Sequence, residues 1–159
     1  MSANNSVRRR LEAQGFSGLD DAAIEEVGPW LRWSPALCTM FMIAGVTLQS
    51  PAILWGLAAT AFLGALLPFH PFDLLYNHGA RHLTGTRPLP HHGPQRRFAC
   101  GMASVWLVTT GWAFQSGAAM LGYALGIPLI LVAALVSVTH ICIPSMIYNA
   151  LLRPRVAEA

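Results

Sequence analysis

The longest uncharged stretch of the chain lies between Arg97 and Arg153 and contains no Asp, Glu, Lys or Arg. A helix that crosses a bilayer needs roughly 20 predominantly apolar residues, so this stretch is long enough for two such helices. Turn-forming residues at Gln115–Gly117 interrupt it near its middle. The pattern therefore predicts an antiparallel pair of transmembrane helices at Phe98–Phe114 and Ala118–Ile147.

A second uncharged stretch lies between Arg32 and Asp73 and is interrupted at Gln49–Pro51. We place one membrane span at about Pro35–Leu48 and the next at about Pro51–Phe69. The expected fold is an all-α membrane protein with four transmembrane helices. These helices form two tandem helical hairpins, and a short amphipathic N-terminal helix precedes them.

These stretches divide the chain into five parts. They are a cytoplasmic arm (1–33), a first transmembrane hairpin (34–70), a cytoplasmic loop rich in His and Pro (71–96), a second transmembrane hairpin (97–151) and a cytoplasmic tail (152–159). In the arm, Met1–Val7 is polar and is expected to be mobile. Ser17–Asp20 resembles a capping box that starts the short amphipathic helix, and Gly28-Pro29 ends it. The first residues show no apolar segment with a small-residue cleavage site, so we expect no cleaved signal peptide.

Composition supports the membrane interpretation. The chain of 159 residues is 54% apolar and only 11% charged, whereas a soluble domain usually carries about 25% charged residues. The net charge of +3 comes without a basic block beside stackable aromatic residues, which argues against nucleic-acid binding. The 3 cysteines all fall in apolar stretches, and an odd number there argues against a secreted disulfide framework.

The arginines predict the orientation in the membrane. They precede the first expected span, fill the central loop and follow the last span, while the two opposite hairpin turns carry no charge. The residues that define this pattern most clearly are Arg32, Arg81, Arg87, Arg96, Arg97 and Arg153. By the positive-inside rule, both termini and the central loop lie in the cytoplasm.

The two hairpins resemble internal copies, because Gln49-Ser50 and Gln115-Ser116 occupy corresponding turns. Small residues recur every fourth position after each turn. They are Ala52, Gly56, Thr60 and Gly64 in the first hairpin, and Ala118, Gly122 and Gly126 in the second. Small residues on one helix face let two backbones approach closely. We expect these ridges to pack helices against each other, or to bind another subunit.

Histidines supply the candidate chemistry of the central loop, at His78, His82, His91 and His92. His78 and His82 would share one face of a helix, because they lie four residues apart. With His91, His92 or Asp73 they could form a zinc-type metal site. The alternative is that these histidines are titratable anchors near the lipid headgroups.

A second candidate site lies at the end of the fourth expected span. Pro144 cannot donate a hydrogen bond to the carbonyl of His140, so the helix should kink or loosen there. Ionisable residues within a span are costly and tend to be functional. His140 could therefore ligate haem or chlorophyll, or it could hydrogen-bond a loop carbonyl at the cytoplasmic interface.

A family resemblance enters at two short motifs. Pro94–Ala99 (PQRRFA) and Cys142–Tyr148 (CIPSMIY) resemble motifs of a bacterial integral membrane family known only as domain of unknown function 4395. The resemblance covers about Trp33–Leu151 and implies a four-helix protein of the bacterial inner membrane. It assigns no activity.

The same resemblance implies a redox motif that this chain has changed. Members of the family carry a Cys-x-x-Cys with a nearby tyrosine. The first cysteine position corresponds to Cys142 and the tyrosine to Tyr148, but the second cysteine position holds Ser145. One thiol of such a pair can resolve a mixed disulfide formed by the other, and Ser145 removes that step. Cys142 alone could still form a mixed disulfide, although burial makes a thiol less reactive.

Three functions are compatible with these observations. The first is a non-catalytic accessory or assembly subunit of a larger photosynthetic or respiratory membrane complex, with other integral membrane subunits and the lipid bilayer as partners. The second is a membrane thiol-redox protein, or a metal- or haem-handling protein, that uses Cys142 and the histidines. The third is a small transporter, which the absence of charged residues within the spans disfavours. No cofactor is predicted, although a bound lipid or pigment stays open, and no enzyme class is supported.

Overall fold

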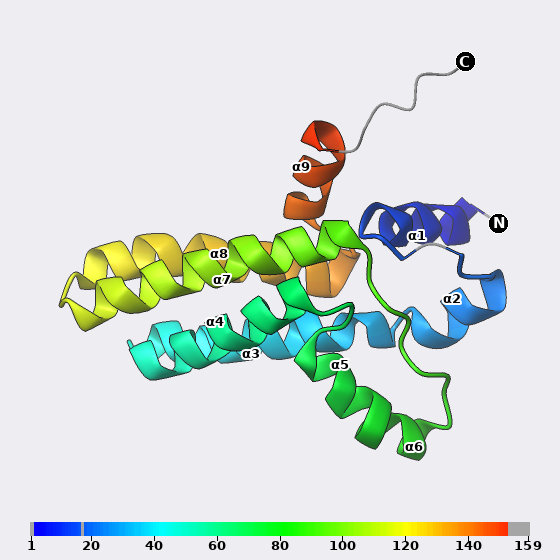
Figure 1. Ribbon diagram of the computed structural model, residues 1–159, viewed down its shortest axis with the longest axis horizontal. Coiled ribbons are helices and arrows are strands. Elements are labelled where there is room, and N and C mark those ends of the chain that lie inside the picture. Colours follow the sequence, from blue (N-terminus) through cyan, green and yellow to red (C-terminus); the bar gives the residue numbers. More distant parts are fainter. Residues whose placement is uncertain (1, 17, 153–159) are drawn as a thin grey trace.

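The computed structural model describes residues 2–16 and 18–152, and these residues fold almost entirely into helices (Figure 1). The all-α prediction is therefore confirmed. In chain order the elements are α1 (Ser2–Ala13), α2 (Asp21–Val27), η1 (Trp30–Arg32), α3 (Trp33–Thr47), α4 (Pro51–Leu66), α5 (Pro71–Leu75), the π-helical turn η2 (Tyr76–Ala80), α6 (Arg81–Thr84), α7 (Pro94–Gln115), α8 (Ala119–Thr139) and α9 (Ile143–Leu151). Ser17 and Arg153 lie outside the described residues.

The four longest apolar helices, α3, α4, α7 and α8, form a bundle (Figure 1). Each packs against two neighbours, in the cyclic order α3, α4, α7, α8, so α3 and α7 lie at opposite corners. Both hairpin turns fall where the polar interruptions predicted them. Ser50 caps α4 by accepting a hydrogen bond from the Ile53 N–H at 3.5 Å, and Gly117 adopts a φ of +79° before α8, a conformation that favours glycine.

The outer faces of the bundle are apolar. Exposed large side chains include Phe62, Leu66, Val105, Trp112, Met120 and Leu131. Among the described residues, α8 is long and apolar enough to cross a membrane, and α4 with the segment Pro71–Thr84 would be a second candidate if that pair, bent by 87°, counts as one span. Helices α3 and α4 have 15 and 16 residues, which corresponds to roughly 24 Å of helix.

The N-terminal arm contains a helix that the sequence pattern did not predict. Met1 lies outside the described residues, and α1 begins at Ser2, within the segment that was expected to be mobile. Leu11 of α1 is buried in a second hydrophobic cluster, with Phe16, Ile24 and Tyr76 among its members. Leu11 therefore packs α1 against residues that are distant in sequence.

The fourth expected span also ends earlier than predicted. Helix α8 stops at Thr139, and His140 adopts a left-handed conformation with a φ of +57°. A separate helix, α9, then begins at Ile143 with Pro144 in its first turn, and it points away from the bundle axis (Figure 1). Pro144 lies in the first turn of α9, where its missing N–H costs no helical hydrogen bond.

One end of the bundle carries nearly all of the polar structure. Helices α1, α2, α5, α6 and α9 gather there, and the two hairpin turns lie at the opposite end (Figure 1). Arginines tie this end together. Arg97 donates to the carbonyls of Ala65 and Leu66 at 2.9 and 2.7 Å, and Arg87 pairs with Glu26 at 3.1 Å. We call this region the charged end.

The small-residue ridges are only partly used within the molecule. A Cβ on Gly122 would lie 2.5 Å from the Phe114 ring, and one on Gly126 would lie 2.6 Å from Val46. Both positions therefore allow close packing of α8. At Gly56, no atom of the described residues lies within 4 Å of a placed Cβ, so of the two expectations for these ridges only contact with another subunit is left for this position.

Candidate functional site: a cavity lined by three cysteines

All three cysteines of the chain line one cavity of about 360 Å³ near the charged end of the bundle. Cys38 comes from α3, Cys100 from α7, and Cys142 directly precedes α9. The walls are otherwise mostly apolar, and the remaining polar lining residues are Gln14, Ser34, His70 and Arg96. We call this space the thiol cavity.

His70 is held rigidly at one side of the thiol cavity, at the start of α5. Its ring Nδ1 accepts a hydrogen bond from the backbone N–H of Phe72 at 3.3 Å, and the backbone N–H of His70 donates to Asp73 Oδ2 at 3.1 Å. The Asp73 carboxylate also accepts a hydrogen bond from the Ser34 hydroxyl. Because Nδ1 is an acceptor, we assign the proton of the neutral ring to Nε2. That nitrogen lies 3.9 Å from Cys38 Sγ.

Burial keeps His70 neutral. It lowers the pKa of His70 to about 4, the positive charge of Arg96 acts in the same direction, and the Asp73 carboxylate opposes both. The neutral ring can donate from Nε2 toward the sulfur of Cys38. This arrangement would stabilise negative charge that develops on that sulfur.

Gly64 of α4 makes room for this cluster. A Cβ on Gly64 would lie 2.8 Å from His70 Cδ2 and 3.3 Å from Cys100 Sγ. The glycine therefore lets His70 and Cys100 meet over the surface of α4.

Cys100 lines the thiol cavity together with Cys38 and Cys142, and its Sγ lies 3.3 Å from the position that a Cβ on Gly64 would occupy. Helices α7 and α9 pack against each other directly, whereas α3, which carries Cys38, occupies the opposite corner of the bundle. Because α9, which directly follows Cys142, packs on the helix that carries Cys100, these two cysteines are the pair that we consider for a disulfide, a bond that needs Cα atoms roughly 4.4–6.8 Å apart. All three cysteines are free thiols in the structure.

Arg96 supplies a buried positive charge to the thiol cavity. Its side chain is 6% exposed, and its guanidinium carbon lies 5.2 Å from the centre of the Phe16 ring. None of the ion pairs among the described residues includes Arg96. A buried cation without a carboxylate partner is costly, and Arg96 is one of the few polar residues that line the thiol cavity.

The N-terminal arm closes the site over the end of α8. Gln14 Nε2 donates to the His140 carbonyl at 2.7 Å, and Arg10 donates to the Thr139 carbonyl at 2.9 Å. Arg32 Nε donates to His140 Nε2 at 2.8 Å. His140 therefore accepts a hydrogen bond through the nitrogen that haem or chlorophyll ligation would use, and its visible role is to join α1 and η1 to the end of α8.

The loop histidines are dispersed. His78 Nδ1 bonds to the Leu74 carbonyl at 3.0 Å, and the His91 ring lies beside Phe69. His92 is buried, and neither of its ring nitrogens has a hydrogen-bond partner among the described residues. Within residues 2–16 and 18–152, no group of three or more His, Cys, Asp or Glu is arranged to hold a metal ion. The structure thus gives no support to a metal site built from His78, His82, His91 and His92.

Sequence reasoning found Cys142 but missed Cys38, Cys100, His70 and Arg96 as members of one site. A signal was present. Each cysteine lies at the arginine-flanked end of its apolar stretch. This pattern predicts that all three thiols lie near the same end of the helices.

Replacing Gly64 with Ala tests the packing of the site. The new methyl group would press on His70 and Cys100, so we expect a lower melting temperature in detergent, equivalent to a loss of about 1–3 kcal/mol of stability. Gly56→Ala on the same helix is the matched control. It enters open space and should be neutral or stabilising by up to about 1 kcal/mol, because alanine favours the helix. Equal melting temperatures for the two variants would contradict this packing.

His92 makes stability depend on pH. Burial lowers its pKa to about 4, and Arg96 acts in the same direction. The unfolded chain then binds more protons than the folded chain as the pH falls below about 6.5, so stability is lost from there toward pH 4. We expect up to about 2 kcal/mol of loss at pH 5 from this residue alone. Thermal melts should therefore show a weaker pH dependence for His92→Asn than for the wild type. Identical pH profiles would contradict a neutral buried His92.

Comparison with known proteins supplies a family. No curated protein and no solved structure matches the chain significantly. The model of a family described as "Domain of unknown function (DUF4395)" matches residues 28–153. This range includes all three cysteines, His70 and Arg96. It begins after α1 and α2, so these two helices lie outside the family match. The chain belongs to the DUF4395 family.

Proposed function

We propose that this protein is a four-span membrane protein that carries out thiol–disulfide redox chemistry with Cys100 and Cys142 as its reactive pair. The observation that carries the proposal is the convergence of all three cysteines on one cavity. The three cysteines lie far apart in the sequence, on α3, on α7 and directly before α9. Their convergence is therefore a result of the tertiary fold and not of neighbouring positions in the chain.

The membrane part of the proposal is supported by the outer surface. Helix α8 is long and apolar enough to span, and large apolar side chains are exposed on α4, α7 and α8. Helices of roughly 24 Å are short for a hydrocarbon core of about 30 Å, a mismatch that local thinning of the bilayer can absorb. The positive-inside rule would place the charged end in the bacterial cytoplasm. A chain that stays in solution without detergent would contradict this part.

The redox part of the proposal must explain which thiol acts as the second one, because Ser145 occupies the second cysteine position of the family motif. Ser145 is fully buried, and its hydroxyl donates to the Gln95 carbonyl at 3.3 Å, which fastens α9 to α7. The second thiol, absent from the Cys-x-x-Cys position, is instead available from Cys100 on the neighbouring helix. A Cys100–Cys142 bond would form as both S–H bonds break, with two protons and two electrons passing to a two-electron oxidant.

Oxidation of intact membranes with diamide, a small reagent that oxidises thiols to disulfides, tests the Cys100–Cys142 pair. We expect a Cys100–Cys142 disulfide that appears in peptide mass maps and removes two sites from maleimide labelling. Cys38→Ser should still form the bond, whereas Cys100→Ser and Cys142→Ser should not. A protein whose three thiols stay fully alkylatable after diamide, or one that joins Cys38 to Cys100 instead, would overturn the assignment.

An accessory subunit of a larger membrane complex is a second candidate. It is favoured by the exposed small-residue face of α4, where Ala52 and Gly56 leave the backbone open to a close neighbour. Gentle-detergent purification should then yield a stoichiometric membrane partner that Gly56→Leu weakens. Purification of a solitary protein would argue against this role and leave the redox proposal intact.

A further inference from the structure

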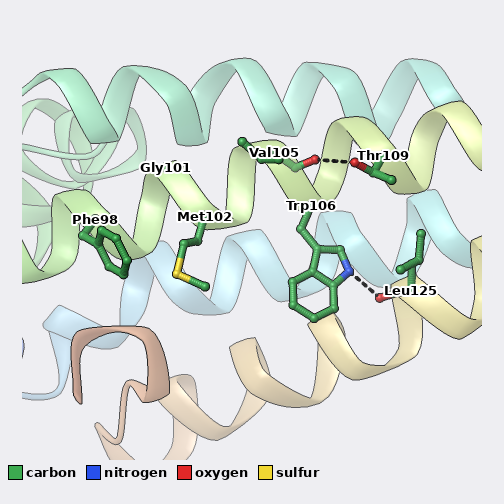
Figure 2. A pocket seen from close by; sticks show the side chains of 7 residues that line it. All are labelled: Phe98, Gly101, Met102, Val105, Trp106, Thr109 and Leu125. Atoms are coloured by element: carbon green, nitrogen blue, oxygen red, sulfur yellow. Dashed lines mark hydrogen bonds between the residues drawn. The ribbon is translucent and has the colours of Figure 1, made fainter. Parts of the chain in front are cut away.

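An open apolar groove runs along the outer surface between α7 and α8 (Figure 2). Its volume is about 650 Å³, and its lining residues are Phe98, Gly101, Met102, Val105, Trp106, Thr109 and Leu125. The Trp106 indole reaches across the groove, and its Nε1 donates to the Leu125 carbonyl at 3.0 Å. We call this feature the lateral groove.

The lateral groove adjoins the thiol cavity. Met102 and Trp106 line both spaces, so these two side chains form the wall between them. Figure 2 shows both side chains extending from α7 toward α8. Methionine is unbranched and adaptable, so Met102 is the part of this wall that can most readily change its rotamer.

The chemistry changes along this path. The lateral groove is apolar and suits a hydrocarbon tail. The thiol cavity holds the buried guanidinium of Arg96, with no ion-pair partner among the described residues, and a guanidinium donates to carbonyl and anionic oxygens. The occupant that fits both parts has an apolar tail and a compact head with acceptor oxygens. The cavity volume of about 360 Å³ falls within the usual range for small-molecule sites.

We propose that a membrane-dissolved quinone enters through the lateral groove and is the oxidant of the Cys100–Cys142 pair. This inference rests on the proposed thiol-redox function. The two S–H bonds break, the S–S bond forms, and the two electrons and two protons reduce the quinone to the hydroquinone. Arg96 donates to a quinone oxygen and stabilises the negative charge that the oxygen gains during reduction. A quinone supplies what the site needs, since it is an apolar two-electron acceptor that the bilayer itself can deliver.

The experiment compares two oxidants on the fully reduced protein in phosphatidylcholine nanodiscs. Decylubiquinone tests the lateral path, and diamide tests the thiols directly. The groove-filling variant is Val105→Trp, and its matched control is Val108→Trp on the same helix, outside the groove. Both valines are exposed, at 70% and 49%, so neither change disturbs the core. The readout is the rate of loss of two maleimide-reactive thiols, with hydroquinone measured in parallel.

We expect decylubiquinone to oxidise the wild type and Val108→Trp at similar rates, with one hydroquinone formed per disulfide. Val105→Trp should be slower with decylubiquinone by at least about tenfold, the effect of a 1.4 kcal/mol barrier, and unchanged with diamide. Arg96→Gln should also lose rate with the quinone more than with diamide.

The possible failures are separable. If diamide forms the Cys100–Cys142 bond but decylubiquinone does not, the quinone inference is wrong and the thiol-redox function stands. If both tryptophan variants behave alike with the quinone, the lateral path is wrong. If neither oxidant forms the bond, the thiol-redox function falls, and this inference falls with it.

Discussion

The close packing of α4 against α7 is the contact on which the rest of the structure depends. Small residues make it possible. Ser104 donates to the Ala58 carbonyl at 3.0 Å, and a Cβ on Gly101 would lie 3.7 Å from the Ala65 side chain. Where lipid tails surround helices, such close packing replaces the hydrophobic drive between them. This contact joins the two hairpins and brings Cys100 over Gly64, next to His70.

Closure of the charged end is the second constraint. The break at His140 frees the last carbonyls of α8, and Gln14 and Arg10 satisfy two of them. Arg32 fixes the His140 ring. The polar arm is thus part of the fold, because it supplies hydrogen bonds that a helix end buried beneath other helices would otherwise lack.

The same end concentrates the chemistry. Apolar walls make charge costly, yet Arg96 and the neutral His70 are both held there. Around them lie three thiols, of which one pair is placed on directly packed elements. Ser145 is buried and bonds to the Gln95 carbonyl, so its visible role is to hold α9 against α7.

The sequence by itself determined the all-α class, the two hairpin turns and the gathering of arginines at one end. These follow from local rules, since apolar run length, turn residues and charge are readable along the chain. Only the tertiary structure decided that Ser2–Ala13 forms a helix and that Gly64 packs within the chain while Gly56 does not. It also decided that Cys38, Cys100 and Cys142 share a cavity. Those outcomes depend on which helix faces meet, and the apolar helices here are apolar on every side, so no periodicity marks the inward face.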